Sequence, residues 1–554
     1  MKFLFPSCLA LMICLISACQ PTSQTETKDA ASRQLPTAQS SDRLNILWIV
    51  TEDLSPYLPA FGDSTIETPN LSRLAAEGVR YTRAFSPSGV CAPSRAALAT
   101  GMYPSSIGAN HMRTGNLHDE MLELIIPYEA VPPAGIKMHS ERLREAGYYC
   151  TNNRKEDYQF KKPLTAWDES SDEAHWRNRA PGQPFFSIFN FTITHESRIW
   201  AKSEDSLWVA EDLPVNVPPY LPDNEVGQRD MRRMYSNLKE MDVMVGEVLA
   251  QLEEDGELEN TVIFFYGDHG GPLPRQKRLC YDSGLQIPLI IRFPNQERAG
   301  EIDEQLVSFI DFKPTIMSLV GIQPEPGMQG RAFLGEYQVS APRKYIHGAG
   351  DRFDAKYDMI RAVRDDRFKY LRNYQPEKPY YLPVKYREQM PVMQELLRLR
   401  DAGELTPEQA LWFRDTKDKE ELFDTEADPH ELNNLAADPQ YAEKLAELRA
   451  ECDRWMAEIQ DVGELPEPEL IEKLWPGSQR PACAEVKMTR TEEGIQLSCE
   501  TEGASIGYQW VNAGEESGES WQVYTEALAP EAGKQLMVVA DRIGYAPSEI
   551  QQIP

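Results

Sequence analysis

One short segment combines a thiol, a proline and an arginine at a spacing that suits chemistry on an anion. In Cys91-Ala92-Pro93-Ser94-Arg95 the thiol stands on a loop just before a helix that Pro93 can open and that the alanines after it propagate well. A helix start attracts anions, and Arg95 adds a forked cation suited to a tetrahedral oxyanion. The alternative is a buried loop of small residues in which Cys91 packs as a small hydrophobe.

Acidic residues and one histidine directly follow two apolar segments of the kind that form buried strands. Glu52 and Asp53 follow the run 45–50, and Asp268 and His269 closely follow the run 261–266. Because parallel strands present their carboxyl ends at one edge of a sheet, we expect these side chains to converge. Such ligands suit a divalent cation, with Ca²⁺ the natural choice and Mg²⁺ the alternative. Taken alone, Glu52-Asp53 also fits a helix or turn cap.

The elements around these residues alternate between apolar strands and amphipathic helices. We expect strands at 45–50, 185–193, 261–266 and 287–293, and helices at 68–77, 137–146 and 231–252. This alternation predicts an α/β fold, a sandwich with a large, mostly parallel sheet flanked by helices. Alternating strands within 345–374, followed by helices at 391–399 and 440–459, indicate a smaller α+β subdomain.

The composition changes again after Pro466. Short alternating segments at 485–489, 494–499, 506–510 and 536–540, separated by Gly-rich turns, predict a small all-β sandwich. This region resembles the carbohydrate-associated β modules of polysaccharide-degrading enzymes. Trp510, Trp521 and Tyr524 have the ring faces to stack on sugar, although we favour packing in the core of the module.

The first residues read as an export signal. Lys2 precedes an apolar stretch too short to span a bilayer, which ends in the lipobox-like Ile16-Ser17-Ala18-Cys19. We therefore expect lipidation at Cys19, a flexible tether at 20–43, and a place in the bacterial cell envelope, at the outer membrane facing the periplasm or the cell surface. The alternative is an ordinary cleaved signal.

Charge and cysteine content narrow the possible partners. The 554 residues carry a formal charge of −30, which argues against nucleic acid and means that an anionic substrate needs a local basic pocket. The cysteines beyond the signal are scattered rather than arranged as a disulfide scaffold. Cys483 and Cys499 are close enough in sequence to pair, but the sequence leaves open whether they do.

The segment around Cys91 closely resembles a known family signature. Cys91-x-Pro93-Ser94-Arg95, followed by Thr100-Gly101-x-Tyr103-Pro104, is similar to that of the formylglycine-dependent type I sulfatases of the alkaline-phosphatase-like superfamily. In that family the cysteine is oxidised to an aldehyde, formylglycine (3-oxoalanine), by a formylglycine-generating enzyme or an anaerobic maturase. The resemblance covers residues 44 to about 460, with five segments in the same order.

The resemblance implies a metal site and a nucleophile. The metal ligands would be Glu52, Asp53, Asp268, His269 and an oxygen of modified Cys91, although relatives usually have Asp where this chain has Glu52. The aldehyde hydrate, held by the metal and Arg95, would attack sulfur, and its second hydroxyl would then expel sulfate.

The resemblance also implies cations around the sulfate. Lys155, His195 and Lys277 match the family's sulfate-binding positions, and His195 could protonate the leaving oxygen. Relatives have a histidine base where this chain has Asp157, so Asp157 or another residue must act as the base. His111 is a weaker candidate for substrate binding, with a structural hydrogen bond as the alternative.

Together these features predict a sulfatase that acts on a sulfated polysaccharide. The expected organisation is a lipoprotein signal at 1–19, a tether at 20–43, a catalytic domain at 44–340, a C-terminal sulfatase subdomain at 341–465 and a β-sandwich module at 482–554. The sequence most resembles bacterial enzymes of the heparan N-sulfatase-like and ulvan-active kind. We prefer O-sulfate hydrolysis on a glycan, and the alternatives are N-sulfoglucosamine hydrolysis, phosphoryl hydrolysis on the same fold and noncatalytic glycan binding.

Overall fold

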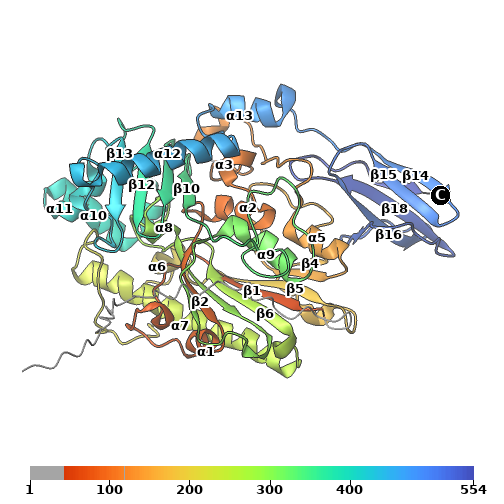
Figure 1. Ribbon diagram of the computed structural model, residues 1–554, viewed down its shortest axis with the longest axis horizontal. Coiled ribbons are helices and arrows are strands. Elements are labelled where there is room, and N and C mark those ends of the chain that lie inside the picture. Colours follow the sequence, from red (N-terminus) through yellow and green to blue (C-terminus); the bar gives the residue numbers. More distant parts are fainter. Residues whose placement is uncertain (1–42, 118, 554) are drawn as a thin grey trace, which may run out of the picture.

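The computed structural model describes residues 43–117 and 119–553 and is built around one large sheet (Figure 1). The strand order is β4-β3-β5-β1-β6-β7-β2-β8, with β9 beside β2. The strands are β1 (Asn45–Thr51), β2 (Val79–Phe85), β3 (Tyr149–Asn153), β4 (Glu169–Ser170), β5 (Phe185–Phe191), β6 (Thr261–Gly267), β7 (Gln286–Arg292), β8 (Ile302–Asp303) and β9 (Val307–Ser308).

The sheet is mostly parallel, as expected from the sequence. β1 pairs in parallel with β5 and with β6, and β3 pairs in parallel with β5. β7, however, is antiparallel to both β6 and β2. Apolar content alone did not distinguish β7 from its neighbours, because a strand buried on both faces reads as a continuous apolar run in either direction. The predicted fold class is confirmed.

Helices cover both faces of the sheet (Figure 1). α1 (Pro69–Glu77) and α7 (Glu225–Glu254) lie on one face, and α2 (Cys91–Thr100), α5 (His139–Glu145) and α9 (Phe312–Leu319) lie on the other. Side chains of β1 alternate between the two cores: Leu47 and Ile49 pack with residues of α7, whereas Trp48 packs with residues of α2, α5 and α9. This alternation follows from the two-residue repeat of a strand.

A second, antiparallel sheet lies within the predicted subdomain 341–465. Its order is β10-β11-β12-β13, formed by Ile346–Gly350, Ile360–Arg364, Phe368–Asn373 and Glu420–Asp424. α12 (Ala442–Ile459) packs on β11 and β12, and α10 (Pro391–Ala402) packs on α7. The other helices are α3 (Pro104–Ile107), α4 (Asp119–Leu122), α6 (Ser197–Ala201), α8 (Asp282–Leu285), α11 (Pro407–Ala410) and α13 (Glu467–Leu474).

The C-terminal strands form two small antiparallel sheets at one end of the molecule (Figure 1). One is β14 (Val486–Thr491) with β15 (Gly494–Cys499), and the other has the order β17-β16-β18-β19 from Gln522–Val523, Ser505–Asn512, Lys534–Asp541 and Gln551–Ile553. Trp521 is 2% exposed, so its ring packs in the interior. Cys483 and Cys499 are both free thiols.

This C-terminal module is joined to the catalytic part by polar contacts. Arg144 donates to the carbonyl oxygen of Trp521 at 2.7 Å, Ser505 Oγ donates to Glu141 at 2.7 Å, and the N–H of Leu164 donates to Asp541 at 2.9 Å. Such buried contacts hold the module against the main body.

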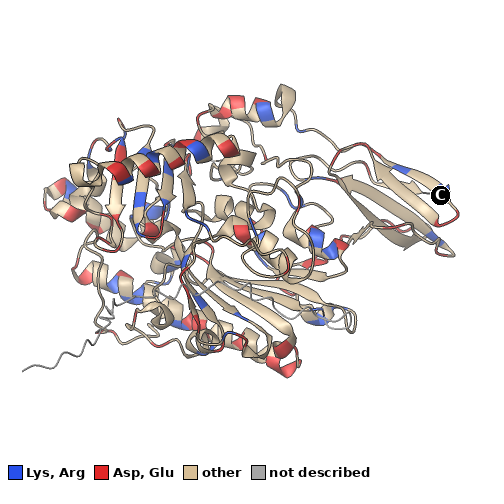
Figure 2. Cartoon of the chain, viewed as in Figure 1, with Lys and Arg blue, Asp and Glu red and all other residues tan. Residues whose placement is uncertain are grey.

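Acidic residues recur on the outer helices, among them α12 and α13, where lysine and arginine are interspersed with them (Figure 2). Within the residues that the structure describes, no helix has the length and apolar composition needed to cross a bilayer. The expected signal peptide, lipidated Cys19 and nearly all of the tether lie outside the described residues and stay predictions.

Candidate active site

Three neighbouring strands bring their carboxyl ends to one place. Thr51, the last residue of β1, is paired with Phe191 of β5 and with Gly267 of β6. The N–H of Asp268 donates to the carbonyl oxygen of Thr51 at 2.8 Å, and the N–H of Glu52 donates to that of Phe191 at 3.1 Å. The residues that follow β1, β5 and β6 are therefore neighbours, as the parallel-sheet rule predicts.

The helix that carries Cys91 begins earlier than expected. Cys91 is the first residue of α2, after Val90 in extended conformation, so the thiol is part of the helix and Pro93 stands in its third position. The expectation of a thiol on a loop before the helix was wrong, because an extended residue before Cys91 is enough to start the turn. Ser94 Oγ donates to the carbonyl oxygen of Asp268, which ties this turn to the end of β6.

Four potential metal ligands come together at this point. One ligand atom from each of Asp53, Cys91, Asp268 and His269 lies within 4.8 Å of the others, and all four residues are buried. Cys91 Sγ lies 3.4 Å from His269 Nε2, which in turn lies 3.0 Å from Asp53 Oδ1. The cluster thus contains two carboxylates, an imidazole and the thiol position.

The donor set fits a cation. His269 Nδ1 lies 3.0 Å from the carbonyl oxygen of Gly270, which can only accept, so Nδ1 carries a proton. In neutral His269 the lone pair of Nε2 then faces the carboxylate of Asp53, and two acceptors at this distance need a proton or a metal ion between them. A carbonyl that orients a metal-binding histidine in this way is common in metal sites.

Glu52 does not join this cluster. Its carboxylate forms an ion pair with Lys155 Nζ, and Glu52 is absent from the group of four that the structure brings together. In this structure Glu52 pairs with Lys155 instead of joining the four, and its ligation of the ion stays a prediction. The physical reason is the neighbouring cation: a buried carboxylate 2% exposed needs a counter-charge, and Lys155 supplies it.

Lys277 neutralises Asp53. Its Nζ lies 2.9 and 2.7 Å from Asp53 Oδ1 and Oδ2, and 3.4 Å from Glu196. Burial opposes the charged form of Asp53, but Lys277, His195 and His269 hold the pKa of Asp53 well below its ordinary value. Burial likewise opposes the charge on Lys277, whose pKa is nonetheless raised by Asp53 and Glu196.

α2 carries both Cys91, a neutral thiol, and Arg95, a cation. Burial raises the pKa of the Cys91 thiol well above its ordinary value, so the unmodified side chain is a protonated and poor nucleophile. Arg95 Nε donates to Asp268 at 3.0 Å and its Nη1 to Asn190 at 2.7 Å. Within the described part of the chain, Arg95 Nη2 is buried without a hydrogen-bond partner, and it is available to an anion.

His195, Lys155 and Asp157 border the cluster. His195 lies within ligand distance of Asp53 and Glu196, and burial followed by Lys277 lowers its pKa to about 4, so its imidazole is neutral at physiological pH. Lys155 Nζ lies 3.8 Å from Asp157, which also contacts Arg113 at 3.3 Å. Asp157 lies in the left-handed region with φ 52°, a strained backbone conformation for a residue other than glycine.

His111 is separate from these groups. Its Nδ1 accepts the N–H of Arg352 at 3.1 Å, and its ring stands edge-on to Tyr357. The structure thus gives His111 the structural hydrogen bond considered as the alternative, and its contact with substrate stays a prediction.

Three residues at the site were not predicted from sequence. Glu196 contacts both Lys277 and Arg278, and Asn190 positions Arg95. Glu196 and Arg278 are direct neighbours of predicted residues, which was a usable signal. Asn190 lies inside a strand otherwise read as apolar, and only the parallel pairing of β5 with β1 places it near α2.

Comparison with known proteins agrees with this geometry. The family model described as "Sulfatase" matches residues 44–125 and 140–322, and a second, described as "N-sulphoglucosamine sulphohydrolase, C-terminal", matches 269–385. An ulvan-active sulfatase of Formosa agariphila is 52% identical to this chain, over 100% of this chain and 97% of its own length.

More distant relatives share the fold. The human N-sulphoglucosamine sulphohydrolase is 27% identical over 78% of this chain and 94% of its own. The solved structure of a 2-O GAG sulfatase superposes with a TM-score of 0.56 at 20% identity, covering 76% of this chain and 93% of that one. At that identity the likeness shows the fold alone.

Proposed function

Since this chain belongs to the sulfatase family, we propose that it hydrolyses sulfate esters on a sulfated polysaccharide or on oligosaccharides derived from it. The observation that carries the proposal is the convergence of Asp53, Cys91, Asp268 and His269 at the start of α2. The same position combines a helix start, which favours anions, with Arg95, whose Nη2 has no partner among the described residues.

The reactive group proposed at position 91 is formylglycine, made from Cys91 by a formylglycine-generating enzyme or an anaerobic maturase. As a hydrate, that aldehyde supplies two hydroxyl groups on one carbon, a nucleophile that can later be released. The chain's own residues orient it: Ser94 ties the first turn of α2 to β6, and burial excludes bulk water around position 91.

The cations around position 91 are arranged for an anion. Arg95, Lys155 and Lys277 surround the cluster, where they can bind the sulfate oxygens and offset the negative charge that develops as the S–O bond breaks. His195 is neutral and half-buried, and in its protonated form it would donate a proton to the leaving oxygen. Asp157 is the proposed base, close to Lys155.

We propose Ca²⁺ for the metal site, with Mg²⁺ as the alternative. Asp53, Asp268 and His269 would hold the ion together with the oxygen at position 91, and Glu52 would join only by leaving Lys155. A divalent cation supplies charge stabilisation for the nucleophilic oxygen. Ca²⁺ is favoured because oxygen ligands predominate once position 91 is oxidised.

Ulvan and related algal glycans are the preferred substrates, because the relative that matches this chain over its full length is described as ulvan-active. N-sulfoglucosamine hydrolysis on heparan is the second candidate, since the N-sulphoglucosamine sulphohydrolase C-terminal model matches 269–385. Phosphoryl hydrolysis is the third. We also propose a lipid anchor at Cys19 and a place in the bacterial cell envelope.

The test uses full-length protein co-expressed with a maturase. We expect sulfate release from ulvan or heparin oligosaccharides, and peptide mass spectrometry should find an aldehyde in place of the thiol at Cys91. Cys91→Ala should fold normally but release no sulfate. Release of phosphate in preference to sulfate, or full activity of Cys91→Ala, would contradict the proposal.

A further inference from the structure

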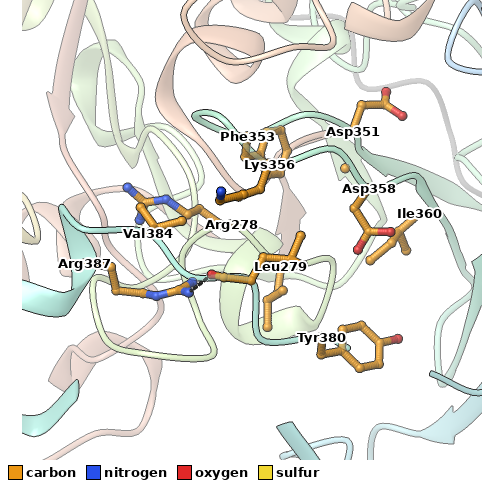
Figure 3. Close-up of a pocket in the computed structure, with 12 residues that line it drawn as sticks. Arg278, Leu279, Asp351, Phe353, Lys356, Asp358, Ile360, Tyr380, Val384 and Arg387 are labelled. Atoms are coloured by element: carbon orange, nitrogen blue, oxygen red, sulfur yellow. Dashed lines mark hydrogen bonds between the residues drawn. The ribbon is translucent and has the colours of Figure 1, made fainter. Parts of the chain in front are cut away.

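A second basic pocket lies beside the proposed sulfate site. It is lined by cations from three segments, Arg278, Lys356 and Arg387, and by apolar groups that include Phe353, Ile360 and Val384. Figure 3 shows the nitrogen ends of the three cations on one side of this pocket and Asp351 and Asp358 on the other.

The pocket adjoins the proposed active site through chain neighbours. Arg278 follows Lys277 directly, and its N–H donates to the carbonyl oxygen of Gly89, two residues before Cys91, at 2.8 Å. Tyr386 precedes Arg387, and its ring centroid lies 6.2 Å from that of His195.

Arg387 is the unusual member of the pocket. It is 4% exposed, its Nη2 donates to the carbonyl oxygen of Leu382 at 2.7 Å, and its Nε is buried with no hydrogen-bond partner among residues 43–117 and 119–553. Within the part of the chain that the structure describes, no carboxylate forms an ion pair with it. Its guanidinium lies over Trp412 at 4.9 Å, which fixes its orientation. A buried, unpaired cation is costly unless a counter-charge arrives.

The carboxylates at the pocket wall do not supply that counter-charge. Asp351 is paired with Arg361 at 2.9 Å, and Asp358 is paired with Lys417 at 2.5 Å. Arg278 is itself paired with Glu196 and Asp354, whereas the ion pair of Lys356 among the described residues is with the exposed Glu120 at 4.0 Å. Burial and the nearby Arg278 lower the pKa of Arg387 to about 10, which leaves it charged at neutral pH. The pocket therefore presents unneutralised positive charge.

We propose that this pocket is a subsite for a second anionic group of the glycan, a uronate carboxylate or a further sulfate, next to the sulfate that is removed. The inference rests on the proposed function and adds to it a substrate that carries two anions on adjacent positions or sugars. Arg387 and Lys356 bind that anion, and Phe353 and Val384 contact the sugar. The overall charge of −30 makes such a local basic subsite necessary for an anionic glycan.

The experiment compares wild type, Arg387→Gln and Lys356→Gln on three probes. These are a uronate-containing sulfated oligosaccharide from ulvan or heparin, the same oligosaccharide after carboxyl reduction, and 4-nitrophenyl sulfate, which has no second anion. On the intact oligosaccharide we expect each variant to lose about 10- to 100-fold in kcat/KM, mainly through KM, and much less on the aryl sulfate.

Arg400→Gln is the matched control. Arg400 lies over the same Tyr381 ring as Arg387, at 5.7 Å against 5.4 Å, but is not among the residues that line the pocket. We expect it to leave kcat/KM unchanged on every probe. If the melting curve shows that Arg387→Gln does not fold, the kinetics of Lys356→Gln, at a more exposed position, decide whether the subsite exists.

The outcomes distinguish a uronate from a second sulfate as the bound anion. They also distinguish failure of the subsite from failure of the proposed function. If carboxyl reduction removes the difference between wild type and variants, the subsite binds a uronate; if the difference persists after carboxyl reduction, the subsite binds a further sulfate. Equal losses on the aryl sulfate and the oligosaccharide, or no loss, would overturn the subsite. If wild type releases no sulfate, the proposed function fails, and calorimetric binding of the intact oligosaccharide to wild type and Arg387→Gln still tests the subsite.

Discussion

Lys277 places its ammonium nitrogen 2.7 Å and 2.9 Å from the two carboxylate oxygens of Asp53, the residue that also joins Cys91 in the four-donor cluster. Both side chains are almost completely buried. Lys277 therefore balances a charge that a metal ion would also balance, and the two cations would share one carboxylate.

Replacing Lys277 should reveal this shared role. In the presence of a chelator, Lys277→Met should lower the free energy of unfolding by about 3 kcal/mol, because the buried Asp53 loses the ammonium group that pairs with it. Added Ca²⁺ should recover part of this loss. Denaturant unfolding with and without Ca²⁺ measures both effects. Lys487→Met, which breaks an exposed pair with Glu500, should leave the free energy of unfolding nearly unchanged. Equal losses with and without the ion would contradict a shared carboxylate.

Metal removal should lower both activity and thermal stability. Because Asp53, Asp268 and His269 converge only in the folded chain, an ion that binds there stabilises the fold, by about 2.7 kcal/mol at a hundredfold excess over its Kd. We expect chelation to lower the Tm and Ca²⁺ to restore it better than Mg²⁺. Asp268→Asn should blunt the response, whereas Asp172→Asn, at an exposed position, should leave it intact. An unchanged Tm after chelation would argue against the site.

Asp157 should prove essential for turnover if it is the base. Asp157→Asn removes the proton acceptor and keeps the shape, so we expect kcat to fall by about 100-fold or more, with a changed pH–rate profile. Arg113→Gln, which removes the exposed partner of Asp157, should have a much smaller effect. Near-normal kcat with the wild-type pH profile in Asp157→Asn would show that another residue acts as the base.

His139 should contribute to acid sensitivity. It is enclosed by Trp48, Phe186 and Trp167, and no described residue forms a hydrogen bond with its buried Nδ1. Burial, followed by Lys313, lowers its pKa to about 3, so between about pH 6.5 and 3 the unfolded chain binds an additional proton. The stability from neutral His139 is thus complete above pH 6.5 and is lost as the pH falls, by up to about 1.4 kcal/mol per pH unit.

His139→Phe should reduce this sensitivity and remove the unsatisfied nitrogen. We expect the difference in Tm between pH 7.5 and pH 5 to be smaller in the variant than in wild type, and the Tm at pH 5 to be higher. An unchanged pH dependence would show that other groups control acid unfolding.

Much of the catalytic centre was predictable from the sequence. The apolar runs at β1 and β6 marked buried parallel strands, and the parallel-sheet rule placed Asp53 and Asp268 at the same edge. Cys91 and Arg95 were recognisable because their segment resembles the sulfatase signature, in which proline and arginine stand at fixed spacing from the cysteine. These features are local, so neighbouring residues encode them.

The tertiary structure decided what depends on residues far apart in the chain. It directed Glu52 to Lys155, 103 residues away, rather than to the metal cluster, because a buried carboxylate takes the nearest cation that the fold supplies. The tertiary structure also places β7 antiparallel to β6, and the apolar content of the segment could not reveal this direction. The fold also buries Arg387 beside Arg278, where no described carboxylate forms an ion pair with Arg387. Charge balance in such a pocket depends on which distant segments of the chain meet there.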